Sequence, residues 1–199
     1  MTTNGNILVL GIGNILWADE GFGVRAVEEF HRRYQVPEDV VLMDGGTQGL
    51  YLVQFVQEAE KLLVFDAVDY GLKPGEMIVV RGDEVPKFTG AKKMSLHQTG
   101  FQEVLSAADF TGHYPSDLTL IGVQALDLED WGGSLTDLVK TKMDEAMAIA
   151  VKQLQDWGVE VVKRDTPLAH RDGLMEHSLD IGGYENGHPL RAFVIDGRA

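Results

Sequence analysis

Residues 7–34 read ILVLGIGNILWADEGFGVRAVEEFHRRY, and this stretch predicts the start of a parallel α/β sheet. The apolar run Ile7–Leu10 has the length of a buried strand and ends at Gly11. From Val24 to Tyr34, apolar residues recur at helical spacing with charged residues between them, which is typical of an amphipathic helix covering one face of a sheet. A strand, a glycine-rich loop and a helix in this order indicate a βαβ unit.

Further apolar runs continue this pattern along the chain. Four more strands are expected at Val40–Met43, Leu62–Phe65, Met77–Val80 and Leu118–Val123. Three more helices are expected at Leu50–Glu60, Thr99–Ala108 and Leu135–Trp157, the second capped by Thr99 and the third the longest. A turn at residues 73–75 leads into the fourth strand without a helix, which indicates an antiparallel edge strand. The predicted fold is therefore three-layer α/β, with a mostly parallel five-stranded twisted sheet and helices on both faces.

The domain organisation follows from length and periodicity. A chain of 199 residues with 44% hydrophobic content can form one domain with a substantial core, which we assign to residues 1–164. Residues 165–199 lose this periodicity, and we expect an irregular or partly disordered tail in which 190–195 could add a short strand. Deleting this tail is expected to cost little stability.

Composition excludes several classes of function. The 17 basic and 31 acidic residues give a net charge of −14, which disfavours binding to nucleic acid or to an anionic membrane surface. Because the chain has no cysteine, Asp, Glu and His are its only strong metal ligands. The N-terminal apolar run lacks a preceding basic region, and no stretch approaches the roughly 20 apolar residues of a membrane span. We expect a cytoplasmic protein with neither nucleic acid nor membrane as a partner.

Acidic, glycine-rich loops follow three of the predicted strands, at residues 11–23, 44–49 and 66–69. The carboxyl ends of parallel strands meet at one edge of a sheet, so these loops should line one crevice. Residues 94–100 bring a histidine to about the same rim.

Three side chains from these segments could form a metal site. Glu20, Asp66 and His97 together give two oxygen donors and one nitrogen donor, a set suited to a first-row divalent ion. We expect their side chains to approach a common point at the edge of the sheet.

A simpler structural role is the alternative for each carboxylate. Asp19 and Glu20 could serve only to cap the helix that follows them, because a helix N-terminus favours negative charge. Asp66 could cap a turn with Asp69, and Asp44 could form a turn before two glycines.

The loop after the first strand also invites comparison with the dinucleotide-binding motif. Gly11 and Gly13 match its first two glycines, but Leu16 stands where the third is required. Asp19 and Glu20 would also oppose a pyrophosphate at the helix entry. A Rossmann-type nucleotide-binding enzyme is therefore retained only as an alternative.

Four motifs together resemble those of the hydrogenase maturation endopeptidases. They are GIGNILWADEGFGVR at 11–25, DGGT at 44–47, FDA at 65–67 and SLHQ at 95–98. The resemblance covers roughly residues 6–160, and residues 68–71 and 91–94 are most similar to the branch that serves membrane-bound uptake hydrogenases.

The resemblance implies an endopeptidase that removes the C-terminal peptide of a nickel-loaded large-subunit precursor of a nickel-iron hydrogenase. By this resemblance the catalytic residues and metal ligands are Glu20, Asp66 and His97, and the substrate-binding loop is Asp44, Gly45, Gly46 and Thr47. The nickel would arrive with the precursor, and the isolated protein could hold another divalent metal. The family uses no serine or cysteine nucleophile, in agreement with the absence of cysteine and of a G-x-S-x-G motif. A non-proteolytic nickel-binding accessory protein is the other alternative.

Overall fold

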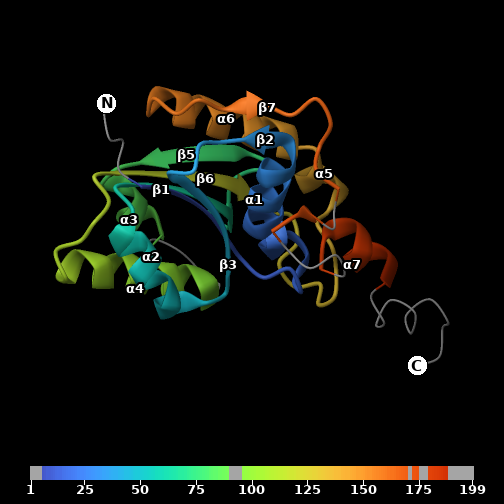
Figure 1. Ribbon diagram of the computed structural model, residues 1–199. Helices are drawn as coiled ribbons and strands as arrows, with labels where there is room; N and C mark the ends of the chain where they lie inside the picture. Colours follow the sequence, from blue (N-terminus) through green and yellow to red (C-terminus); the bar gives the residue numbers. More distant parts are fainter. Residues whose placement is uncertain (1–5, 90–95, 170–171, 175–178, 188–199) are drawn as a thin grey trace.

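The computed structural model describes residues 6–89, 96–169, 172–174 and 179–187 and is built around a five-stranded sheet (Figure 1). Its strands are β1 (Ile7–Ile12), β3 (Val40–Gly46), β4 (Lys61–Val68), β5 (Met77–Arg81) and β6 (Asp117–Gln124). In the order β3-β1-β4-β6-β5, the first four are parallel and β5 runs antiparallel to β6 at the edge. The predicted α/β class, all five strands and the antiparallel edge strand are therefore confirmed.

Helices cover both faces of this sheet, as expected (Figure 1). On one face lie α1 (Phe22–Arg33), α5 (Asp137–Lys140) and α6 (Met143–Asp156). On the other lie the 3-10 helix η2 (Gly49–Leu52), α2 (Val53–Glu58), α3 (Glu84–Thr89) and α4 (Leu96–Phe110).

The two resulting cores share the strands between them. In β1, Ile7 and Val9 are buried in the α1 core, whereas Leu8 and Leu10 are buried in the core under α2 and α4. This alternation follows from the period of two along a strand, and it explains why strands covered on both faces read as continuous apolar runs.

Several helix boundaries differ from those predicted. The segment expected as one helix over Leu135–Trp157 is divided into α5 and α6, and α4, with 15 residues, is longer than α6, with 14. Near the break, the Thr141 hydroxyl donates to Leu138 O at 2.6 Å, a side-chain bond to the backbone that weakens helix continuity. The capping role expected for Thr99 is wrong, because α4 begins at Leu96. The sequence also did not predict α3 or the two-stranded sheet of β2 (Tyr34–Gln35) and β7 (Val162–Lys163).

The described part of the C-terminal segment packs against α1. It contains α7 (Ile181–Gly187), in which Tyr184 is buried beneath the Arg25 guanidinium at 5.4 Å. Arg25 also donates to Leu179 O, and Leu174 N donates to Glu28 Oε2 at 2.8 Å. The possible strand at 190–195 lies outside the described residues.

The described part of the chain contains no helix with both the length and the apolar character needed to cross a bilayer.

Removing residues 165–199 is now expected to lower the free energy of unfolding by about 2–4 kcal/mol, rather than to cost little. The estimate comes from one buried aromatic side chain and the hydrogen bonds to Arg25 and Glu28. Urea unfolding of the full-length protein and of the protein without residues 165–199 measures the difference. Removing only residues 188–199, which retains every described contact, is the control, and equal midpoints for all three proteins would contradict the expectation.

Candidate active site

The N-terminus of α1 lies directly against the backbone of two strands. A Cβ atom on Gly23 would fall 2.2 Å from both Ile12 O and Phe65 O, and one on Gly11 would fall 2.3 Å from Gly23 O. No side chain fits in such contacts, so glycine at these positions allows the helix to sit over the carboxyl ends of β1 and β4. The helix N-terminus is thereby brought to the edge where the predicted site residues lie.

The loop between β1 and α1 folds back on itself and carries Glu20. Gly13 has a φ of +134°, and a Cβ atom there would fall 1.9 Å from Glu20 O. Asn14 N donates to that oxygen at 3.1 Å, which closes the loop. Glu20 is half-buried in the 3-10 helix η1 (Ala18–Gly21), and η1 contacts β4. The elements bearing Glu20 and Asp66 therefore lie side by side.

Asp66 lies within β4 rather than after it and is only 4% exposed. It is paired in register with Gly122 of β6, in the interior of the sheet. The phenol of Tyr70 lies near enough that the Asp66 charge, after burial, contributes to raising the pKa of Tyr70. Tyr70 therefore stays protonated as a potential hydrogen-bond donor beside this carboxylate.

His97 is the second residue of α4, not a loop residue before it as expected. Its side chain lies outside the described residues. The backbone of α4 reaches the same edge of the sheet, because α4 packs on η2 and a Cβ atom on Gly100 would lie 3.8 Å from Gly49 Cα.

A cavity of about 110 Å³ lies between α4 and the loop after β3. It is lined by Ile12, Gly46, Thr47, Gly49, Leu52, Gly100 and Phe101. Two residues of the predicted substrate-binding loop, Gly46 and Thr47, thus face a cavity, and its glycines leave the main chain open to a ligand.

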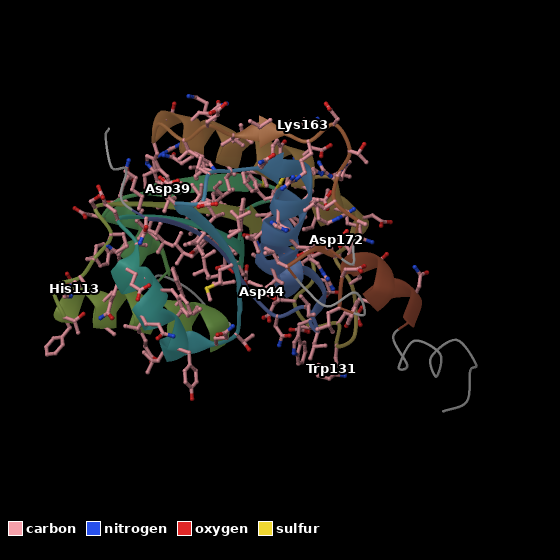
Figure 2. The ribbon with its side chains drawn as sticks, in the orientation of Figure 1. Asp39, Asp44, His113, Trp131, Lys163 and Asp172 are labelled. Carbon is pink, nitrogen blue, oxygen red and sulfur yellow. The ribbon has the colours of Figure 1, made fainter. Side chains whose placement is uncertain are left out.

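Asp44 stands at the carboxyl end of β3, beside this loop (Figure 2). Its Oδ1 accepts from Gly46 N at 2.9 Å, and Gly46 O accepts from Gly13 N at 3.0 Å. Burial raises the pKa of Asp44, although the bond from Gly46 N and the charge of Arg25 lower it in part. Asp44 forms the expected turn and also links the loops after β1 and β3.

The described residues contain no group of three Asp, Glu or His side chains arranged to hold a metal. That search does not include the side chain of His97. The structure therefore brings the Glu20 and Asp66 elements together and places the start of α4 at the same edge.

Sequence reasoning missed the buried Gln124 near this edge, and it considered Asp19 only as a helix cap. Asp19 is fully buried and bonded to a segment more than 100 residues away. Gln124 ends β6 and accepts from Tyr70 N at 2.8 Å, which fixes the loop that carries Tyr70. A glutamine that ends an apolar strand was the only available signal for Gln124, and its partner could not be read from sequence.

Several known proteins with similar sequences and folds carry names that refer to hydrogenase formation or maturation. A family model described as HycI, hydrogenase maturation protease, matches residues 24–153. The chain is 63% identical over 179 residues to the hydrogenase expression/formation protein HupD of Bradyrhizobium diazoefficiens, covering 90% of this chain and 93% of that protein. It is 66% identical to HupD of Rhizobium leguminosarum bv. viciae, over 90% and 88% of the two chains. The structure of the hydrogenase maturating endopeptidase HybD from E. coli matches with a TM-score of 0.76 and 41% identity, over 80% of this chain and 98% of that one.

The fold, the acidic edge and these matches define an α/β endopeptidase. The chain belongs to the hydrogenase maturation protease family. This assignment replaces the Rossmann-type nucleotide-binding alternative.

Asp44→Asn should raise the free energy of unfolding at pH 7. A raised pKa means that the folded protein binds this proton more tightly than the unfolded chain, so the ionised carboxylate costs stability above the folded pKa. The cost disappears as the pH falls through that pKa, and the advantage of the variant should shrink with it. The amide oxygen can still accept from Gly46 N. Urea unfolding at several pH values tests this, and a variant less stable at pH 7 would contradict it.

Proposed function

We propose that this protein removes the C-terminal peptide from the nickel-loaded large-subunit precursor of a nickel-iron hydrogenase. Membership of the maturation protease family is the observation that carries the proposal. The high identity to HupD proteins supports a precursor of the kind that those proteins serve.

In this proposal Glu20, Asp66 and His97 are the residues that meet the nickel of the substrate. Two carboxylates and an imidazole match the donors that first-row divalent ions accept. The contact of η1 with β4 supports a joint role for Glu20 and Asp66. The isolated protein could bind another divalent ion through the same three groups. We further propose that the cleavage depends on a metal.

The loop Asp44–Thr47 would hold the precursor segment that contains the scissile bond. The adjoining cavity of about 110 Å³ is too small for a folded domain and suits one short side chain of an extended peptide. Asp44 would bind a basic residue beside the scissile bond, because its carboxylate is hydrogen-bonded to Gly46, which lines that cavity. Recognition through a few such contacts cannot by itself select one protein among many, so a nickel-dependent contact would supply the rest of the selectivity.

The deciding experiment is incubation of this protein with the nickel-loaded precursor, followed by intact-mass measurement. We expect loss of a short C-terminal peptide. The nickel-free precursor and a free peptide spanning the cleavage site should be cut at least about 100-fold more slowly, a difference of about 2.7 kcal/mol in transition-state stabilisation. Equal rates for all three substrates would instead indicate an ordinary metalloprotease. Nickel binding without cleavage would indicate an accessory protein.

His97→Ala should reduce the processing rate at least about 100-fold without unfolding the protein. Loss of one loop or helix-end hydrogen bond costs only about 1 kcal/mol, much less than the stability of a domain of this size. His113→Ala is the matched control, since His113 lies beyond the other end of α4, is exposed and has its ring nitrogen Nδ1 3.0 Å from Thr111 O (Figure 2). Full activity in a folded His97→Ala protein would remove this residue from the proposed site.

A further inference from the structure

We propose that Asp19 is a positioning residue, which holds the turn bearing Glu20 in place by binding the segment 126–136. The inference rests on the proposed function of Glu20 but concerns a residue to which that function assigns no role.

The carboxylate of Asp19 connects two distant parts of the chain. It is fully buried, and its Oδ2 accepts from Leu126 N at 2.9 Å and from Asp127 N at 3.0 Å. Thr136 N donates to Oδ1 at 2.7 Å, and the Thr136 hydroxyl donates to Oδ2 at 3.1 Å. Three of these four hydrogen bonds reach Oδ2 and one reaches Oδ1, and the side chain has no exposed surface. Asp19 is therefore inaccessible to a metal or a substrate, which separates its role from the one proposed for Glu20.

Further contacts on either side of this carboxylate also join residues 16–19 to the segment 126–136, and we call this contact region the junction. Asp19 N donates to Asp127 O at 3.1 Å, and Gly132 N donates to Leu16 O at 2.8 Å. Trp17 forms a bridge with Trp131, and their rings meet edge to face with centroids 5.2 Å apart. Residues 16–19 are thus docked along their length on the segment 126–136.

The turn that carries Glu20 needs such support because its backbone is strained. Ala18 has a φ of +37°, the only positive φ outside glycine among the described residues. A non-glycine residue in this region costs about 1–3 kcal/mol and persists only where its surroundings enforce it. Asp19 follows Ala18 directly and Glu20 follows Asp19, so the bonds to Asp19 fix the direction in which Glu20 leaves the turn.

Asp19→Asn is the informative substitution because it keeps the shape of the side chain and replaces one acceptor oxygen by an NH2 group. The amide can accept through only one atom, whereas main-chain N–H groups point at both carboxylate oxygens. Whichever way the amide turns, its NH2 group faces a main-chain donor. The segment 126–136 should then separate locally from the turn.

The test compares Asp19→Asn with Leu154→Ala, a core variant in α6 that loses buried apolar contacts, lies outside both segments and takes no part in the hydrogen bonds to Asp19. Hydrogen exchange provides a readout independent of activity. In Asp19→Asn the amides of Leu126, Asp127, Thr136 and Glu20 should exchange at least about tenfold faster while those of β1 and β4 stay protected. In Leu154→Ala the exchange rates of these four amides should change no more than those of the amides of β1 and β4.

Processing of the nickel-loaded precursor gives the second readout, under conditions where both variants are folded. Asp19→Asn should lower kcat about 100-fold with KM changed less than about threefold, because misplacing a group by about 1 Å can cost that factor. Leu154→Ala should keep kcat within about twofold of the original protein. If the unaltered protein does not process the precursor, the proposed function fails, whereas the exchange result still tests the junction.

The positioning role is overturned if Asp19→Asn retains protected amides at these four residues, or if its kcat falls only in proportion to the unfolded fraction. Should Asp19→Asn not fold, Thr136→Val replaces it, since this variant loses one of the four donors to Asp19. It should show the same changes at smaller amplitude, and Thr136→Ser, which keeps the hydroxyl, should restore them. Unchanged exchange and kcat in Thr136→Val would then overturn the role.

Discussion

The backbone contact of Gly23 with Ile12 O and Phe65 O is the constraint on which the rest of the site depends. Any side chain at this position would lift α1 from the ends of β1 and β4. The loop before the helix would then no longer reach β4, and η1 would lose its contact with the strand that carries Asp66. The glycines of this region therefore act by bringing main chains together, and they place a carboxylate-bearing turn where a nucleotide-binding protein would place a phosphate.

Much of the sheet could be predicted from sequence because a strand buried on both faces needs an uninterrupted apolar run. Apolar runs such as Leu62–Phe65, which lie between turn signals, are too short for helices and therefore indicate strands. The break between α5 and α6 and the start of α4 at Leu96 could not be predicted, because they depend on local bonds and packing rather than on periodicity. Likewise, the C-terminal segment packs through a few scattered apolar side chains such as Tyr184 and through hydrogen bonds with Arg25 and Glu28, which leave no periodic apolar signal.

Topology alone predicted that the loops after the parallel strands meet at one edge of the sheet, and the acids Glu20, Asp44 and Asp66 all lie on elements that meet there. The partners of a single buried carboxylate were not predictable. Asp19 and Glu20 are adjacent acids that look alike in the sequence. Asp19 accepts hydrogen bonds from residues 107–117 positions away, whereas Glu20 is half-exposed. Adjacent acids can therefore differ, one buried and bonded to a distant part of the chain and the other partly exposed, and only the fold separates them.

The strand order β3-β1-β4-β6-β5 also has a consequence for how the molecule is made. Because β1 is an interior strand, it pairs with β3 and β4, which are synthesised later, and β4 pairs with β6 from a point about 50 residues further on. Sheets with such distant pairings fold slowly, since the long loops between paired strands must close before most of the stabilising contacts can form. The segment 126–136, which binds Asp19, follows β6 in the chain, so a chain synthesised only as far as β6 contains the turn of Glu20 but lacks the residues that bind Asp19.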